Sequence, residues 1–425
     1  MSFSRRSVIA IIIVTAIACL AIGATIGAHI TLNRLVELED KLKEIEKIRS
    51  ELSNIKSEIA DASRALSKIQ NQVRYLNSSI ISIEERIHRI NVTGSLESIY
   101  SVIYERVRDS IVLVKCIARE ETVFGYEYVE KQGSGFIYNC NGMFVVLTNN
   151  HVVRDAINII VTFSNGESYP AKLLGGDPYA DLAVLSVNAP LNLLKPLEIV
   201  SSSMLKIGDE VIVVGNPFGL TSSIRHGIVS QLGRAIPGEM TGGFPLADVI
   251  QISVPINPGD SGAPLLNLKG QVVGIATAIV RGAQGVGFAI SSDTILREVP
   301  YLIEHGYYDL HPWLGIACTD MTYEIAKVMK VNVTYGVLVV EVVEGSPADK
   351  AGLRGGNRTV EITGRTYVIG GDIIIAINGT KVISVDSLVT YLEKYTLPGQ
   401  TVELTIMRNG KIIKINVTLE KRPLR

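Results

Sequence analysis

Cysteine, histidine and tryptophan are sparse in this sequence. The 425 residues include four cysteines, six histidines and one tryptophan. The cysteines, at positions 19, 116, 140 and 318, are too few for a dense disulfide framework and lack the spacing of a zinc site. We therefore expect neither a metal nor an organic cofactor. A Cys116–Cys140 bridge stays open for an oxidising compartment, although a simple antiparallel alignment of their strands does not place the two opposite each other.

The sequence also lacks an excess of positive or negative charge. Lysine and arginine number 41 against 42 aspartates and glutamates, for a formal net charge of −1. This balance gives no overall basic field and no nucleic-acid-binding motif appears, so we expect no nucleic-acid partner. The length predicts two or three domains. A hydrophobic content of 47% is enough for substantial cores.

One long uncharged segment lies near the N-terminus. Two arginines at positions 5–6 precede a run over residues 7–28 that is rich in Ile, Val and Ala. At about 1.5 Å per residue the run can cross a hydrocarbon core of roughly 30 Å. We therefore predict a cytoplasmic tail at 1–6 and a membrane anchor at 7–30, with the rest of the chain outside the cytoplasm. A cleaved signal peptide, twin-arginine export and a lipoprotein site at Cys19 are the alternatives.

Residues 33–92 show the strongest periodicity in the chain. From Leu52 to Ile90, apolar residues recur in alternating steps of three and four, with charged residues between them. This heptad pattern predicts a coiled-coil stalk, and isoleucine at both core positions favours three or four strands over two. A solitary long helix or a helical hairpin is the alternative.

Three short motifs with catalytic residue types follow in order: one around His151, one beginning at Asp181 and one around Ser261. A serine hydroxyl attacks a carbonyl carbon only when a neighbouring imidazole takes its proton. A carboxylate orients that imidazole and stabilises its charged form. We therefore predict Ser261 as the nucleophile, His151 as the general base and Asp181 as the orienting acid, in the order found in chymotrypsin-type enzymes.

The glycines near Ser261 widen the range of backbone conformations that this turn can adopt. Gly259 can adopt angles closed to other residues, so its N–H and that of Ser261 can point at one spot. Convergent N–H groups make an oxyanion hole, which we assign to the backbone of Gly259, Asp260 and Ser261. Singly, each motif also fits a turn or the end of a strand. The order and spacing of all three together favour catalysis.

With these motifs the sequence resembles the HtrA/Deg family of extracytoplasmic serine proteases over residues 100–422. Two positions depart from the family pattern: Asp260 stands where Asn is frequent, and Ala263 where Gly is frequent. Further segments carry the resemblance: Gly133–Ile137, Gly208–Gly219, Gly227–Ser230, Leu265–Asn267, Gly270, Val273–Ile275 and Gly287–Ile290.

Short Val- and Ile-rich stretches separated by Gly, Asn and Pro turns predict an all-β barrel or sandwich over residues 100–298. The resemblance makes this a mainly β fold, a chymotrypsin-like pair of six-stranded barrels with the triad in the cleft between them. Segments 119–132, 234–248 and 281–285 are expected to be loops. Nine strands are expected, at 111–117, 135–138, 144–148, 157–163, 183–187, 211–215, 227–232, 272–276 and 287–289.

The pocket for the residue before the cleaved bond is expected to be apolar. The segments on either side of the nucleophile motif hold no acidic residue, so selection of Lys or Arg is not expected and small or aliphatic side chains are favoured. The same residues also fit an ordinary core. The predicted lining is Ile256, Asn257, Ile275, Ala276 and Thr277.

Residues 308–422 resemble a PDZ domain, an α+β module that binds the end of a peptide as an added strand. The segment 358–370 is expected to be an inserted loop or hairpin. Residues 314–316 are expected to capture the peptide carboxylate, while residues recurring at helical spacing line the facing wall of the groove, although these also fit an ordinary core. The predicted groove residues are Leu314, Gly315, Ile316, Val385, Leu388, Val389 and Leu392.

The sequence thus predicts a membrane-anchored serine endopeptidase that acts on unfolded or misfolded proteins outside the cytoplasm. The resemblance implies a homotrimer and C-terminal peptides as ligands of the PDZ domain. The alternative is a tethered chaperone or peptide-binding adaptor whose protease fold is dormant, or a scaffold whose two domains only bind protein.

Overall fold

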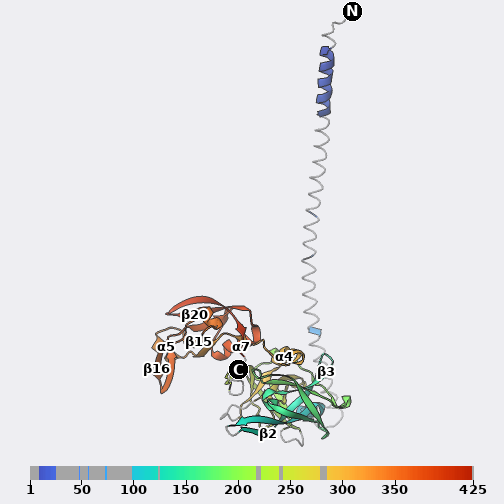
Figure 1. Cartoon of the computed structure of the whole chain (residues 1–425), viewed down its shortest axis with the longest axis vertical. Coiled ribbons are helices and arrows are strands. Elements are labelled where there is room, and N and C mark those ends of the chain that lie inside the picture. The colour runs from blue at the N-terminus through green and yellow to red at the C-terminus, as the bar shows by residue number, and fades with distance from the viewer. Residues whose placement is uncertain are drawn as a thin grey trace, which may run out of the picture. The chain divides into compact units, whose positions relative to one another are not determined.

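The computed structural model describes residues 9–24, 47, 56, 72–73, 98–122, 125–216, 222–238, 243–277 and 285–423. The chain divides into two compact units, Met1–Leu96 and Glu97–Arg425. Residues 9–24 of the first unit form a helix (Figure 1). Within the described residues, no helix is both long and apolar enough to span a bilayer. The predicted stalk, residues 33–92, lies outside the described residues apart from four positions.

The first barrel of the second unit is closed and has six strands in the order β1–β2–β3–β6–β5–β4. Neighbouring strands are antiparallel, with Ile111 opposite Phe136 between β1 and β2. Val, Ile and Leu fill the interior because their branched side chains suit a pleated, buried surface. The strands are β1 Ile111–Thr122, β2 Gly125–Cys140, β3 Met143–Asn149, β4 Ala156–Thr162, β5 Ser168–Asp177 and β6 Leu182–Val187.

A second closed barrel follows, in the order β10–β11–β12–β9–β8–β7. Its strand β11 is buried at every position, as expected for a strand covered on both faces. The strands are β7 Glu210–Gly215, β8 Ser223–Ile236, β9 Leu246–Ile252, β10 Pro264–Leu266, β11 Val272–Thr277 and β12 Gly287–Ser291. The prediction of two six-stranded barrels is confirmed.

Helix α4, Ser292–His305, follows the second barrel in the chain and packs against both barrels. Ser291 caps its first turn by accepting a hydrogen bond from the Thr294 amide, and Gly306 ends it in the left-handed conformation. Its apolar side packs into one cluster with residues of both barrels. The other helical segments here are α2 Ile99–Val107, η1 Arg108–Ser110, α3 Asn150–Val153, η2 Leu191–Leu193 and η3 Ser202–Met204.

The C-terminal domain is built on a separate sheet with the order β14–β15–β18–β20–β21, in which β19 pairs with β18. Figure 1 labels β15 and β20 of this sheet. Helix α7 begins with a capping box at Ser384 and Ser387. The strands are β13 Pro312–Trp313, β14 Ile316–Asp320, β15 Val337–Val342, β16 Arg358–Ile362, β17 Arg365–Ile369, β18 Ile373–Ile377, β19 Thr380–Lys381, β20 Thr401–Arg408, β21 Lys411–Thr418 and β22 Glu420–Lys421, and the helices are α5 Tyr323–Met329, α6 Pro347–Lys350 and α7 Val385–Tyr395.

The expected loops need correction. Most of 119–132 is not a loop, because β1 and β2 continue as a paired hairpin out to Thr122 opposite Gly125. Backbone pairing holds this hairpin even though its outer side chains, including those of Tyr126 and Tyr128, are exposed. Segment 234–248 contains the ends of β8 and β9, while 281–285 lies outside the described residues except for Gly285. Strands β5 and β9 were not predicted, and β10 was expected only through the family resemblance at Leu265–Asn267, whereas the inserted hairpin at 358–370 is present as β16 and β17.

Candidate active site

His151 and Asp181 are joined by two hydrogen bonds. The Nδ1 atom of His151 lies 2.8 Å from Oδ2 of Asp181, and the His151 backbone N–H donates to Oδ1 at 2.9 Å. Because a carboxylate only accepts hydrogen bonds, Nδ1 carries the proton and Nε2 is left free to act as a base. The carboxylate is almost fully buried, whereas the imidazole remains partly exposed. This is the arrangement required of a general base and its orienting acid.

The turn before β6 places the Asp181 carboxylate. Asp181 has a φ of 53°, an unusual angle for a residue other than glycine. Its carbonyl accepts from the Asn150 amide at 3.1 Å and the Asn149 side chain at 3.0 Å. The Thr277 hydroxyl donates to Oδ2 at 2.7 Å, from strand β11 of the other barrel. Both barrels therefore contribute to the position of this carboxylate.

Ser261 follows a sharp turn at Gly259, whose φ is 95°. Ser134 holds this turn: its hydroxyl donates to the Gly259 carbonyl at 2.7 Å, and its amide donates to the Ser261 carbonyl at 2.8 Å. Within the described part of the chain, neither the Gly259 nor the Ser261 amide donates a hydrogen bond. The Asp260 amide, by contrast, donates to the Asn257 carbonyl at 2.9 Å, so it is removed from the predicted oxyanion hole.

Close backbone contact brings the serine and histidine motifs together. A Cβ atom at Gly133 would lie 2.8 Å from both the Ser261 carbonyl oxygen and a methyl group of Val152. Only glycine allows this approach, and Val152 directly follows His151 in helix α3. The Ser261 hydroxyl makes no hydrogen bond with the described residues. The hydrogen bond between a catalytic serine and its histidine base is often long or poorly aligned without substrate, and it tightens when substrate binds.

An ion pair supports the turn that carries the nucleophile. Oδ2 of the fully buried Asp260 lies 2.5 Å from Nη1 of Arg225 in β8 and accepts the Asn257 amide at 2.7 Å. The other oxygen of Asp260 has no hydrogen-bond partner among the described residues. A buried carboxylate is costly unless a cation compensates it. Arg225 therefore allows Asp260 to remain inside the protein, next to Ser261.

We expect the Arg225→Gln substitution to lower kcat by roughly a hundred- to a thousandfold, the usual cost of losing an oxyanion-hole donor. The uncompensated Asp260 carboxylate would move toward solvent and carry the Gly259 and Ser261 amides with it. The double variant with Asp260→Asn removes that charge and should recover most of the activity. Steady-state kinetics on a short peptide substrate would measure this, and equal losses in the single and double variants would contradict it.

The predicted pocket residues lie in different surroundings. Ile275 packs in the cluster shared with α4, and Ile256 and Ala276 pack in the core of the second barrel. Asn257 is exposed. Thr277 is buried, with its hydroxyl on the Asp181 carboxylate, so it supports the triad. Its polarity in an otherwise apolar strand was the one sequence signal for this contact.

All seven predicted groove residues of the C-terminal domain line one groove of about 690 Å³. The Leu314 and Gly315 carbonyls accept from the Ala348 and Val343 amides, both at 2.9 Å, which turns these oxygens into the domain. Phe244 and Pro245, which belong to the segment between β8 and β9, also line the groove.

Among the described residues, one group has donor atoms close enough for a metal ion: Asp177, Glu298 and His311, whose atoms lie within 4.8 Å of one another. Protein cations already engage these carboxylates. The Glu298 Oε1 atom lies 2.6 Å from Nη2 of Arg297, and Asp177 Oδ2 lies 2.8 Å from Nε2 of His311. We therefore assign no metal to this group.

Cys116 and Cys140 are both free cysteines. Cys116 lies opposite Lys131 on the neighbouring strand and Cys140 lies opposite Met143, so the two cysteines are not opposite each other.

Two family models match the chain, a trypsin-like peptidase domain over residues 133–275 and a PDZ domain over residues 312–419. The barrels, the triad pair and the groove thus define a trypsin-like serine protease fold joined to a PDZ domain.

Similar proteins place the chain more closely. The chain is 36% identical over 328 residues to "Protease Do-like 1, chloroplastic" of Arabidopsis thaliana, which covers 76% of this chain and 71% of that protein. It is 40% identical over 295 residues, 69% of its length, to a "Probable periplasmic serine endoprotease DegP-like" of Chlamydia trachomatis. That match spans 54% of the relative, so the chain spans about half the length of such curated relatives.

A solved HtrA-type protease, AlgW with a tripeptide, is 30% identical, with a TM-score of 0.60 over 77% of this chain and 98% of AlgW. A serine endoprotease from Yersinia pestis is 27% identical, with a TM-score of 0.51 over 77% of this chain and 100% of that structure. The chain belongs to the HtrA/Deg family of serine proteases.

Proposed function

We propose that this chain is a serine endopeptidase that degrades unfolded or misfolded proteins outside the cytoplasm. The observation that carries the proposal is the His151–Asp181 pair, with contacts of 2.8 Å and 2.9 Å, together with a serine turn whose Gly259 and Ser261 amides donate to none of the described residues. Neither the His151–Asp181 pair nor the serine turn alone indicates a reaction. Together they supply a base and a site for developing negative charge.

The first half of the reaction forms an acyl-enzyme. The Ser261 oxygen attacks the carbonyl carbon of the scissile peptide bond while Nε2 of His151 takes the hydroxyl proton. The charge that develops on the substrate oxygen is stabilised by the amides of Gly259 and Ser261. When the intermediate collapses, His151 gives its proton to the departing amine, the C–N bond breaks and the acyl group stays on Ser261.

The second half repeats these steps with water. His151 takes a proton from the water that attacks the acyl carbon and then returns a proton to the Ser261 oxygen as the ester bond breaks. Asp181 stays ionised throughout and stabilises the imidazolium in both halves. The products are a new carboxylate, a new amine and the regenerated enzyme.

The groove of the PDZ domain suits an extended peptide. Strand β14 lies at the edge of its sheet, which leaves one side for pairing with an added strand. Val385, Leu388, Val389 and Leu392 of helix α7 line the groove and favour apolar side chains. We infer that C-terminal peptides bind here, as substrate ends or as activating ligands. The solved AlgW structures with a decapeptide or a tripeptide support this.

Location and assembly are proposed from the sequence. The apolar run at 7–30 supports anchoring by one N-terminal helix, and the heptads at 33–92 together with the family resemblance support a homotrimer. The relatives named as periplasmic support an extracytoplasmic protease. A trimer would carry three cleavage sites and three peptide grooves. Once one site holds an unfolded chain, the effective concentration of the other sites around that chain is raised.

The test is to incubate the purified protein with a reduced, unfolded model protein and identify the fragments by mass spectrometry. A sample treated first with a serine-directed phosphonate is the control. We expect fragments that end in small or aliphatic residues, and none after the phosphonate has modified Ser261. Cleavage that continues after complete modification would contradict the assignment. Retention of the uncleaved protein by both samples would favour the chaperone or adaptor.

A further inference from the structure

One buried serine of the first barrel has all of its polar groups engaged near the nucleophile. Ser134 lies in β2 and is fully buried. Its amide donates to the Ser261 carbonyl at 2.8 Å, and its carbonyl accepts the Thr148 hydroxyl at 2.7 Å. Its hydroxyl donates to the Gly259 carbonyl at 2.7 Å and accepts the Asn216 amide at 2.8 Å. Hydrogen bonds thus join this residue to four separate positions of the chain.

The two partners of the Ser134 hydroxyl fix the direction of its proton. The Asn216 backbone N–H can only donate, so it takes a lone pair of the hydroxyl oxygen. The Gly259 carbonyl can only accept, so the hydroxyl proton points at it. A serine hydroxyl usually rotates to suit its surroundings, whereas this one has a single arrangement that satisfies both neighbours. Ser134 therefore offers the nucleophile turn one fixed donor.

These bonds act on the two carbonyls that flank the peptide bond between Asp260 and Ser261. The Gly259 carbonyl is held by the Ser134 hydroxyl, and the Ser261 carbonyl is held by the Ser134 amide. Gly259 has a φ of 95°, in a region of backbone conformations that glycine enters freely, so its own preferences do not hold the turn. The hydroxyl bond therefore helps to determine where the Gly259 and Ser261 amides, the two predicted oxyanion donors, point.

The same residue is tied to the strand that leads to the general base. Thr148, which donates to the Ser134 carbonyl, lies in β3, three residues before His151. The contact is close, because a Cβ atom at Gly262 would lie 2.0 Å from the Ser134 carbonyl oxygen and 2.4 Å from the Thr148 hydroxyl. Only glycine fits there, at a φ of 89°. The strand before the base and the nucleophile turn are thus both positioned against Ser134.

A buried hydroxyl needs partners wherever it lies, so hydrogen bonding alone would also fit a residue that only stabilises the fold. The identity of the partners argues for more. Ser134 belongs to the first barrel, whereas the Asn216 amide directly follows β7 and the Gly259 carbonyl precedes β10, both in the second barrel. The hydroxyl therefore connects one barrel to the other at the turn that carries the nucleophile.

We propose that Ser134 is a positioning residue for the oxyanion hole: its hydroxyl holds the Gly259 carbonyl and thereby directs the Gly259 and Ser261 amides at the substrate oxygen. The proposal rests on the proposed function and adds a residue that touches neither the substrate nor the reacting atoms. Without the hydroxyl, the Asn216 amide and the Gly259 carbonyl lose their partner inside the protein, at a cost that favours another arrangement. The peptide planes of the turn can then rotate, and the two amides no longer converge on one point.

The first test is the Ser134→Ala substitution. It should lower kcat for a short peptide anilide by about ten- to a hundredfold, with little change in KM. The loss is smaller than the roughly hundred- to a thousandfold that follows removal of an oxyanion-hole donor, because both amides remain in the chain. Ser134→Cys, whose thiol is a weak donor, should lose at least about tenfold and decides the question if the alanine variant does not fold. A folded variant of either kind with kcat within about twofold of the wild type would overturn the proposal.

Ser291→Ala is the matched control. Ser291 is also buried, and its hydroxyl likewise accepts a backbone amide, that of Thr294 at 3.3 Å, and donates to an oxygen, Oδ2 of Asp248 at 2.8 Å. The substitution should lower the thermal stability about as much as Ser134→Ala does, yet leave kcat within about twofold of the wild type. Equal losses of kcat in the two variants would show a general loosening of the fold and overturn the assigned role.

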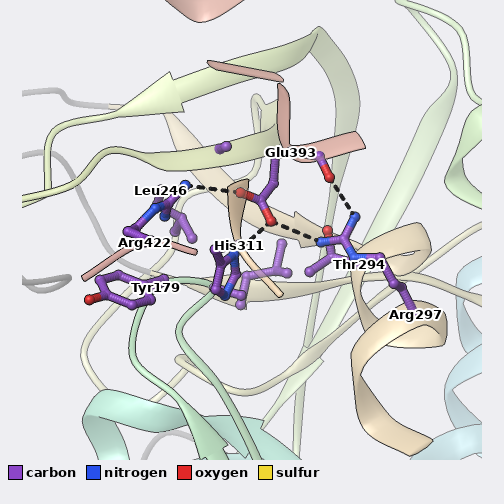
Figure 2. A pocket seen from close by; sticks show the side chains of 10 residues that line it. Tyr179, Leu246, Thr294, Arg297, His311, Glu393 and Arg422 are labelled. Carbon is purple, nitrogen blue, oxygen red and sulfur yellow. Dashed lines mark hydrogen bonds and ion pairs between the residues drawn. The ribbon is translucent and has the colours of Figure 1, made fainter. Parts of the chain in front are cut away.

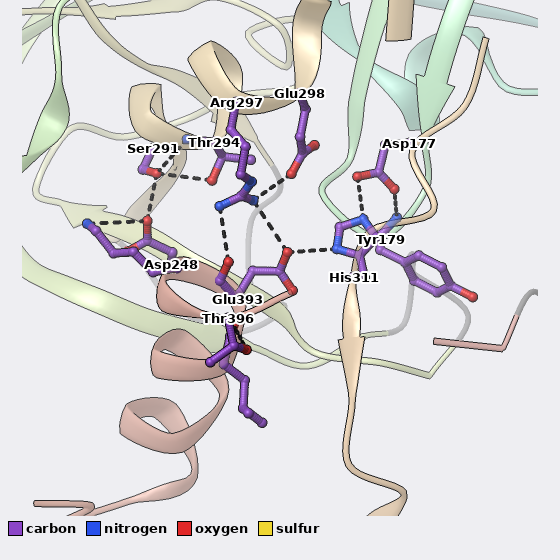
Figure 3. Close-up of polar contacts among 12 residues, drawn as sticks. Asp177, Tyr179, Asp248, Ser291, Thr294, Arg297, Glu298, His311, Glu393 and Thr396 are labelled. Carbon is purple, nitrogen blue, oxygen red and sulfur yellow. Dashed lines mark hydrogen bonds and ion pairs between the residues drawn. The ribbon is translucent and has the colours of Figure 1, made fainter. Parts of the chain in front are cut away.

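The control residue lies in a different polar region of the protein. Figure 2 shows Thr294 near Arg297 and His311 on the wall of a small pocket. Figure 3 shows the Ser291 hydroxyl next to Asp248 and Thr294. Within the described part of the chain, the hydrogen bonds of the Ser291 side chain go only to those two residues. Ser291→Ala therefore measures what the loss of a buried hydroxyl does away from the nucleophile turn.

A peptide boronic acid tests the oxyanion hole more directly. The Ser261 oxygen bonds to boron as its proton passes to Nε2 of His151, and the adduct is tetrahedral and negatively charged, like the transition state. The inhibition constant should rise in Ser134→Ala by about the factor by which kcat falls, and it should stay near the wild-type value in Ser291→Ala. An inhibition constant that Ser134→Ala leaves unchanged would overturn the proposal, whatever happens to kcat.

Amide hydrogen exchange, followed by mass spectrometry, requires no hydrolysis. The Asp260 and Gly262 amides report on the turn because both donate to backbone carbonyls at 2.9 Å. Exchange over residues 257–263 should be at least about tenfold faster in Ser134→Ala than in the wild type, and unchanged in Ser291→Ala. Unchanged exchange in Ser134→Ala would overturn the role of the hydroxyl. A wild type that cleaves nothing, together with the expected exchange, would instead reject the proposed function and support the position of Ser134.

Discussion

Ser261→Ala should lose about a millionfold in kcat, and His151→Ala about as much, while the double variant should lose no more than either alone. The reason is that the two side chains perform one step. Without the imidazole the hydroxyl keeps its proton, and without the hydroxyl the imidazole has nothing to activate. What remains should be a small rate above water, from the Gly259 and Ser261 amides and from substrate binding.

The measurement is single-turnover hydrolysis of a peptide ester or anilide, with circular dichroism to show that each variant is folded. The fold should survive because Ser261 is held mainly through its backbone: its carbonyl accepts the Ser134 amide at 2.8 Å. Losses that multiply in the double variant would mean that Ser261 and His151 act independently. That result would contradict the triad while leaving the barrels intact.

The candidate triad could be proposed from the sequence because each member lies in a short motif whose residue types have a chemical purpose, and the structure brings His151 and Asp181 together. A serine flanked by glycines, a histidine after an apolar strand and an aspartate before another are visible in the sequence. The seven groove residues were predicted for a similar reason, since helical spacing and a Gly-containing loop mark them. Each of these patterns is local, and local patterns can be detected without knowing the fold.

The supporting contacts could not be predicted because they join residues far apart in the chain. Thr277 reaches Asp181 across 96 positions, and His311 reaches Asp177 across 134. Arg225 meets Asp260 only because β8 and the nucleophile turn belong to the same barrel. The outer part of the β1–β2 hairpin, predicted as a loop, is exposed at 119–121 and 125–128 and so lacks the buried face that marks a strand in the sequence. Backbone pairing, which leaves little trace in residue type, holds it.

Asp181→Asn is the second large effect, and the structure shows why a nearly isosteric change should be severe. Oδ1 accepts the His151 backbone N–H at 2.9 Å, and a backbone N–H can only donate. The asparagine must therefore place its carbonyl oxygen there and its NH2 group where Oδ2 lies, 2.8 Å from Nδ1. Nδ1 must then accept, so the ring proton moves to Nε2 and the nitrogen facing the nucleophile can no longer act as a base. The Thr277 hydroxyl can rotate to suit either partner.

We expect Asp181→Asn to lower kcat by about ten-thousandfold with KM little changed, because substrate binding does not involve this carboxylate. Nitrogen NMR of the histidine ring would show the exchanged tautomer directly. The matched control is Thr277→Val, which removes one hydrogen bond to the same carboxylate and keeps its charge. It should cost only about fivefold, in line with roughly 1 kcal/mol for a single buried hydrogen bond. A Thr277→Val variant as inactive as Asp181→Asn would mean that the hydroxyl, and not the tautomer of His151, determines the position of the catalytic acid.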